Sequence, residues 1–245
     1  MTRRLARDES GFSLVELLTA VSIGLVIMFA AMTLLDLSAK GQRRTADRVE
    51  AVQSGRILMD QIVARLRSQL CPGTATSGVE DPAVQIAEKD RIAFYGSFAG
   101  APTVSGRVQL QRREISFVPT SSDRGNVVER VWNAPYTSTN PKPVPPPITA
   151  TPDSVRTLAT NIAREKSGIA FFRYRKYNAP NSPDMTELTA PVTDPDARAL
   201  IVQVDVAFDA FPAVGADSRL RTSYVDQAFV RTADPTDPTH SPRCL

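Results

Sequence analysis

Residues 11–35 read GFSLVELLTAVSIGLVIMFAAMTLL, and Glu16 is the one charged side chain among them. As an α-helix, residues 12–35 would be roughly 36 Å long, which exceeds the ~30 Å hydrocarbon core of a bilayer. We therefore predict a membrane-spanning helix at 12–36. A charged side chain at the centre of such a span costs about 2.5–3.5 kcal/mol, so Glu16 should have a positively charged partner.

The α-amino group of Phe12 would supply that partner if the chain were cut after Gly11. Residues 11–16, GFSLVE, resemble the N-terminal signal of prepilins and pseudopilins, the subunits of type IV pili and type II secretion filaments. The resemblance implies a leader peptide at 1–11, cleavage after Gly11 by the prepilin peptidase, and N-methylation of Phe12. It also implies that Glu16 acts in assembly with other pilin or pseudopilin subunits on an inner-membrane assembly platform.

Two other interpretations of the apolar stretch fit less well. An uncleaved signal anchor would leave Glu16 unexplained. A secretory signal peptide usually has an apolar region of ~7–15 residues followed by a small-x-small cleavage site. This stretch is longer, and residues 36–38, DLS, make a poor site of that kind.

The helical pattern continues beyond the apolar stretch. Residues 36–70 contain no proline, and apolar side chains recur there at spacings of three and four: Val49, Val52, Met59, Ile62, Val63, Leu66 and Leu70. This spacing predicts an amphipathic half of the helix at 37–71, which ends at Cys71-Pro72-Gly73. The prepilin resemblance implies that this half packs on a sheet. The predicted fold class is α+β, a pilin-like long N-terminal helix on an antiparallel β-sheet head.

Residues 72–245 form the predicted β-rich head. The patterns predict strands at 83–87, 91–98, 107–118, 127–132, 168–177, 199–209 and 224–230. Between them, 178–196 and the proline-rich 140–152 are predicted as loops, and 232–245 as a polar tail. A change of phase near Arg112 and Arg113 indicates a bulge or turn. Val155, Leu158 and Ile162 are spaced as in one or two helical turns over 154–163. In 199–209, strict alternation predicts one buried face and one wet face.

Composition restricts the function. The 245 residues carry a formal charge of +3, and removal of 1–11, with three basic and two acidic residues, leaves +2. Because this charge is nearly balanced, we do not expect nucleic acid as a partner. His240 is the lone histidine, and the phosphate-loop, GxSxG, HExxH and CxxC motifs are absent, so we expect no catalytic residues, no cofactor and no metal.

Cys71 and Cys244 are the two cysteines. Two thiols far apart in sequence fit one structural disulfide in an exported protein, and the alternative is two separate thiols. The disulfide would tie the tail to the end of the long helix.

Two less favoured sites remain open. Asp184, Glu187, Asp194 and Asp196 share one loop and could bind calcium, although their spacing does not match an EF-hand. The basic and aromatic stretch 171–177, FFRYRKY, could bind single-stranded DNA by stacking, as in competence pilins, whereas an amphipathic strand is the simpler interpretation.

These features predict a minor pilin of a type IV pilus or a minor pseudopilin of a type II secretion system. It would lie in the cytoplasmic membrane with its head outside, in contact with lipid. The rival class is a membrane-anchored binding protein or enzyme that uses the helix as a tether. Cleavage after Gly11 separates the two classes.

Overall fold

The structure of the chain is a computed structural model that describes residues 12–70, 82–96, 103–104, 107–108, 110–134, 145–165, 169–178, 183–212 and 220–230. The chain divides into two compact units, residues 1–46 and 47–245. The predicted sites at Gly11, Cys71 and Cys244, and the tail 232–245, lie outside the described residues.

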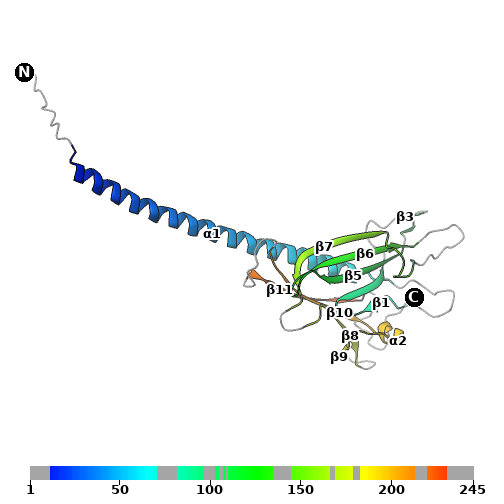
Figure 1. Cartoon of the computed structure of the whole chain (residues 1–245). Coiled ribbons are helices and arrows are strands. Elements are labelled where there is room, and N and C mark those ends of the chain that lie inside the picture. Colours follow the sequence, from blue (N-terminus) through cyan, green and yellow to red (C-terminus); the bar gives the residue numbers. More distant parts are fainter. Residues whose placement is uncertain are drawn as a thin grey trace, which may run out of the picture. The chain divides into compact units, whose positions relative to one another are not determined.

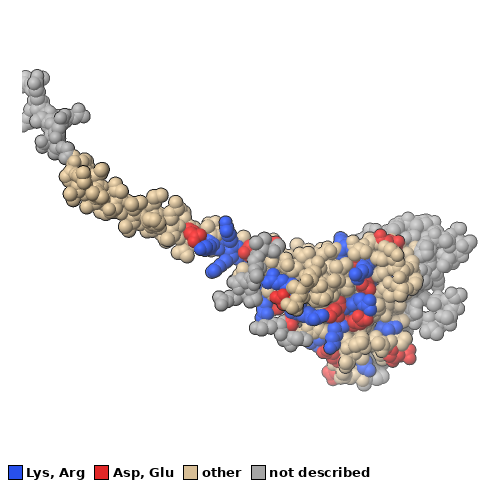
Figure 2. Space-filling model, viewed as in Figure 1, with Lys and Arg blue, Asp and Glu red and all other residues tan. Residues whose placement is uncertain are grey.

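The first unit contains the apolar part of helix α1 (Leu14–Arg67). Every side chain from 12 to 46 is exposed, and the most apolar 18-residue window has a mean hydropathy of 2.3. Figure 2 shows a largely uncharged surface along the start of this helix. By length and composition, the helix can cross a membrane.

In the second unit, one face of α1 is buried. Its buried residues are Ala51, Gly55, Leu58, Met59, Ile62, Val63 and Leu66, which follow the spacing of three and four. The helix ends at Arg67, and the chain then bonds to the sheet, where the Leu70 amide donates to the Tyr95 carbonyl at 2.9 Å. The amphipathic pattern correctly placed Met59, Ile62, Val63 and Leu66 on the buried face, whereas Val49 and Val52 are exposed and the helix ends at Arg67, before the predicted end at 71.

Among the described residues, nine strands form one antiparallel sheet that curls around this face of the helix (Figure 1). The order is β1-β2-β5-β6-β7-β10-β8-β9, and β11 pairs with the other edge of β10. Their bounds are β1 (Val84–Ala87), β2 (Arg91–Gly96), β5 (Gln111–Pro119), β6 (Gly125–Asn133), β7 (Ser154–Ala163), β8 (Phe172–Tyr177), β9 (Met185–Leu188), β10 (Gln203–Ala210) and β11 (Thr222–Phe229). A separate hairpin joins β3 (Thr103–Val104) to β4 (Arg107–Val108), and α2 (Pro195–Ala199) contacts β1. The α+β prediction, a long helix on an antiparallel sheet, is confirmed.

The core lies between the sheet and α1. A row of aromatic rings crosses it, from Phe117 to Phe171 to Phe208 to Tyr224, with successive ring centroids 5.9, 5.5 and 5.4 Å apart. The first three rings are buried. Phe117 lies in β5, Phe171 directly precedes β8, and Phe208 lies in β10. The row thus joins strands that are far apart in sequence to one core.

The structure corrects three local predictions. Residues 154–163 form strand β7, because backbone pairing with β6 overrides the helix-like spacing. The region 178–196, predicted as a loop, contains β9 and the start of α2. A bulge or turn was predicted near Arg112 and Arg113. Strand β5 is regular from Gln111 onward, so the interruption lies earlier, between β4 and β5.

Strand β10 is a fourth correction. All eight of its residues are buried, although one face was predicted to be wet. Its polar side chains are covered by neighbours: Arg175 Nε donates to Asp205 at 2.8 Å, and Gln203 donates to Gln227 at 2.9 Å. Long side chains with charged ends thus lie over the polar face and exclude water from it.

Candidate functional site at the start of the apolar helix

The start of α1 is fixed by Ser13. Its hydroxyl accepts a hydrogen bond from the Glu16 amide at 3.2 Å, and its carbonyl accepts from the Leu17 amide at 3.1 Å. Ser13 is therefore an N-cap, which places the first helical residue at Leu14, two residues after Phe12. Phe12 precedes the helix and its side chain is 78% exposed, so the predicted new terminus stands clear of regular structure.

Glu16 lies in the first turn of α1, where the amides of the helix end favour a negative charge. Among the described residues, neither a hydrogen bond nor an ion pair reaches its carboxylate. Gly11 lies outside those residues, so pairing of Glu16 with a terminal amine stays a prediction.

The hydroxyls in the apolar part of α1 are satisfied within the helix. Those of Thr19, Ser22 and Thr33 donate to the carbonyls of Glu16, Leu18 and Ala30 at 3.0, 2.8 and 2.8 Å. In hydrocarbon an unpaired hydroxyl is costly, and these bonds remove that cost. Glu16 is then the one ionisable group in this segment that still needs a partner.

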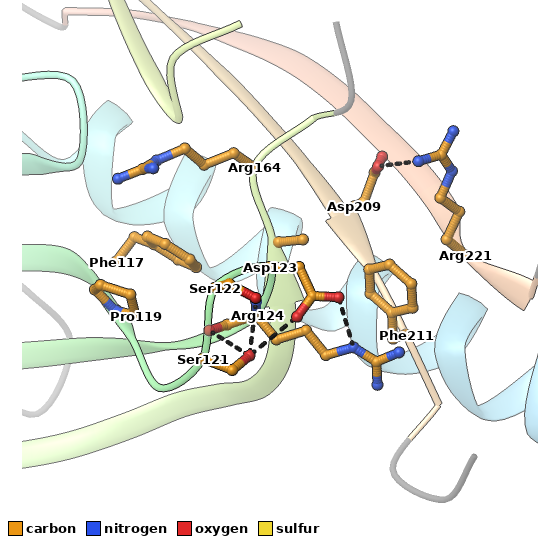
Figure 3. Close-up of a pocket in the computed structure, with 11 residues that line it drawn as sticks. Phe117, Pro119, Ser121, Ser122, Asp123, Arg124, Arg164, Asp209, Phe211 and Arg221 are labelled. Carbon is orange, nitrogen blue, oxygen red and sulfur yellow. Dashed lines mark hydrogen bonds and ion pairs between the residues drawn. The ribbon is translucent and has the colours of Figure 1, made fainter. Parts of the chain in front are cut away.

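The head contains a second candidate, a pocket of about 320 Å³ that the sequence did not reveal (Figure 3). Phe117, Ala163 and Phe211 supply apolar walls, and Arg124 stacks 4.3 Å above the ring of Phe211. The Ser121 hydroxyl bonds to Asp123 at 3.1 Å and stands beside no histidine among the described residues. Arg164 binds Asp90 at 2.8 Å, and Arg221 lies 3.6 Å from Asp209. The pocket can hold a small ligand, but it contains no pair of nucleophile and base.

A buried charge cluster also went unseen in the sequence. Glu129 of β6 is 4% exposed and lies 2.5 Å from Arg65 of α1, 2.7 Å from Arg113 and 3.3 Å from Arg156. Burial raises the pKa of Glu129, but the hydrogen bonds and charges of Arg65 and Arg113 outweigh it and hold the pKa below its usual value. The sequence contained one indication that Glu129 is buried, because it alternates in phase with the apolar Val127 and Val131 along the strand.

The two less favoured sites gain no support. Phe171, Phe172 and Tyr174 are fully buried in the core, so they offer no faces on which bases could stack. Within the part of the chain that the structure describes, no three His, Cys, Asp or Glu side chains come together as a metal site. Asp194 instead caps α2 by accepting from the Asp196 amide at 3.1 Å.

Comparison with known proteins bears on the start of α1. Residues 6–32 match the family model of the prokaryotic N-terminal methylation motif. The matched segment contains Gly11, Phe12 and Glu16. No curated protein matches the chain. The match points to a structural, pilin-like precursor, and with the apolar helix it fits a membrane-anchored protein. In this motif, and in a long helix packed on an antiparallel sheet, the chain resembles the type IV prepilin-like proteins.

Proposed function

We propose that the chain is a minor pilin of a type IV pilus or a minor pseudopilin of a type II secretion system. The observation that carries this proposal is the methylation motif at 6–32, followed at once by an apolar helix with Glu16 as its one charge before Asp36. The protein performs no chemistry in this role. Its helix joins a bundle of other subunits, and its head supplies the filament surface.

The proposal divides the chain by role. Residues 1–11 are a leader, 12–36 span the membrane and later join the filament core, 37–71 connect to the head, and 72–245 form the β-rich head. The prepilin peptidase and an inner-membrane assembly platform are the expected partners, and the head lies outside the cytoplasmic membrane. We also propose a disulfide between Cys71 and Cys244, which requires an exported head.

The N-terminus of the mature protein tests the function. Co-expression with a prepilin peptidase should give a mature chain that starts at a methylated Phe12, read by mass spectrometry of the N-terminal peptide. Gly11→Leu should leave the precursor uncut, because a larger side chain blocks the close approach of the peptidase to the backbone. Gly24→Leu is the matched control, since a Cβ at Gly24 meets nothing within 4 Å, and it should be cut normally. A mature chain that starts elsewhere contradicts the proposal.

The pocket of Figure 3 favours the second candidate, a membrane-anchored binding protein. In that case the helix is a tether, and the chain keeps residues 1–11 in the presence of the peptidase. The same measurement therefore decides between the two. A DNA-uptake role loses most of its support, because three of the four aromatic side chains in 171–177 are buried and only Tyr177 is partly exposed.

A further inference from the structure

Besides the terminal strands β1 and β9, two strands of the head, β7 and β11, have an edge that no other described strand fully covers. Strand β7 pairs with β6 along its length, but on its other side it meets β10 only at Ile162 and Ala163. Strand β11 pairs with β10 over all eight of its residues, and no described strand lies on its outer side. Neither strand contains proline or lysine, the residues that commonly prevent pairing at an open edge.

The edge of β7 is basic and partly apolar. Val155 is 60% exposed, and the Arg156 side chain is 59% exposed. Arg156 shares the Glu129 carboxylate with Arg65 and Arg113, so three guanidinium groups meet one carboxylate and the cluster has a formal charge of +2. A carboxylate brought to this edge from outside would meet an excess of positive charge.

The edge of β11 has the complementary character. Val225 is 60% exposed and Phe229 is 36% exposed. Asp226 lies between them and is exposed, and among the described residues no lysine or arginine pairs with it. Within the described part of the chain, its carboxylate accepts one hydrogen bond, from the neighbouring Gln227 amide at 2.7 Å.

These two edges cannot pair within one chain, because β10 lies between β7 and β11. We propose that β7 of one copy pairs with β11 of a second copy, with Arg156 opposite Asp226. The side chains agree in direction: Arg156 reaches Glu129 and Tyr224 reaches Val52 of α1, so Arg156 and Asp226 both lie on the helix-facing side of the sheet. Val155 and Val225 then share the other face.

Such pairing is head-to-tail, since each copy uses a different edge toward each neighbour. It continues from copy to copy without closing on itself unless the rotation happens to form a ring, which is the type of contact that builds filaments. The partner is a second copy of this chain, because the edge of β11 has a charge opposite to that of the β7 edge, a similar length and an equally exposed valine. The inference does not depend on cleavage after Gly11.

Charge exchange on the full-length protein in mild detergent tests the pairing. Sedimentation equilibrium should show concentration-dependent association of the wild type with fewer than one chain per micelle. Asp226→Arg and Arg156→Glu should each weaken association roughly tenfold, because an opposite pair becomes a like pair. The double variant Arg156→Glu/Asp226→Arg should regain most of it.

Asp196→Arg is the matched control, since Asp196 is exposed on α2, which contacts the terminal strand β1 and neither β7 nor β11, and it should leave association unchanged. Circular dichroism checks the fold of each variant, and Asp226→Arg remains decisive if Arg156→Glu disturbs the Glu129 cluster. A wild type that stays monomeric overturns the proposal, as does association that none of the exchanges changes. Either result leaves the Gly11 experiment unaffected.

Discussion

Glu129 joins the helix to the sheet through a buried carboxylate. Its carboxylate lies on the core side of β6 and is bonded to Arg65 of α1 at 2.5 Å and to Arg113 of β5 at 2.7 Å. We expect Glu129→Gln to lower the free energy of unfolding by roughly 2–4 kcal/mol, because it leaves buried guanidinium groups without their counter-charge. Chemical denaturation of the head measures this. The control is Glu187→Gln, at a half-exposed carboxylate 3.9 Å from Arg173, which should change the free energy of unfolding little.

The same residue predicts a pH dependence. The pKa of Glu129 is lower in the folded protein than in the unfolded chain, so the unfolded state binds the proton more tightly. The stabilisation is therefore complete above the unfolded pKa of about 4.3 and is lost as the pH falls through the folded value. Unfolding curves between neutral and acidic pH should show a steeper loss for wild type than for Glu129→Gln. Parallel curves would contradict this assignment.

Glu16 makes a residue-scale prediction about assembly. Pairing that offsets even half of the ~2.5–3.5 kcal/mol cost of a charge in lipid changes an equilibrium roughly tenfold. We expect Glu16→Ala to insert and fold normally but to enter filaments about tenfold less, counted in sheared filaments. Glu50→Ala, at an exposed acid on the same helix, is the control. Equal incorporation of Glu16→Ala and wild type would refute the assembly role.

At the scale of elements, α1 meets β11 at a glycine. A Cβ at Gly55 would lie 2.2 Å from Cε2 of Tyr224 and 2.9 Å from Cβ of Ala210. The Tyr224 hydroxyl donates to the Val52 carbonyl at 2.5 Å, so the ring is held against the helix. Gly55→Ala should therefore lower the Tm of the head even though alanine favours helix by about 1 kcal/mol. Gly41→Ala, where a Cβ meets nothing within 4 Å, should not lower it.

The elements also show what the sequence could predict. Long patterns were reliable: the spacing of Met59, Ile62 and Leu66 predicted the buried face of α1, and the GFSLVE stretch predicted the methylation motif. Strand β7 was misjudged because shifts in its register with β6, and a left-handed Asn161 with φ of 56°, break the alternation that identifies a strand. The phase of Glu129 with Val127 and Val131 indicated that Glu129 is buried, but its arginine partners and the pocket depend on contacts between β5, β6, β7 and β10, which are too distant in sequence to leave a local pattern.

At the scale of the whole molecule, all the α1 residues that pack on the sheet lie in the second unit, 47–245. A chain that begins at residue 47 should therefore unfold cooperatively, followed by the near-ultraviolet circular dichroism of the buried Trp132. A chain that begins at residue 68 loses five large apolar side chains worth about 1.5–3 kcal/mol each, comparable to a net stability of ~5–15 kcal/mol. It should have no cooperative transition, and a normal transition would contradict the helix as part of the core.

The proposed disulfide is also a whole-molecule prediction. A bond between Cys71 and Cys244 closes a loop of more than ~100 residues, for which chain entropy gives about 4–5 kcal/mol, often less in practice. Non-reducing peptide mapping of protein from its own membrane should recover the linked peptides. Reduction should lower the Tm of the wild type but not of Cys71→Ser/Cys244→Ser. A Cys244 that alkylates freely in the oxidised protein would exclude the bond.

If the chain moves from lipid into a filament as proposed, the internally bonded hydroxyls of α1 determine which interactions it must exchange. Thr19, Ser22 and Thr33 take their carbonyl acceptors with them, so neither phase has to solvate them. The preference of the helix for the lipid bilayer or for the filament core then depends on packing, except at Glu16. In the proposed assembly the Glu16 carboxylate needs a positive partner at its destination, so we expect incorporation to be favourable only where the amine of a cleaved Phe12, from its own chain or a neighbour, is within reach.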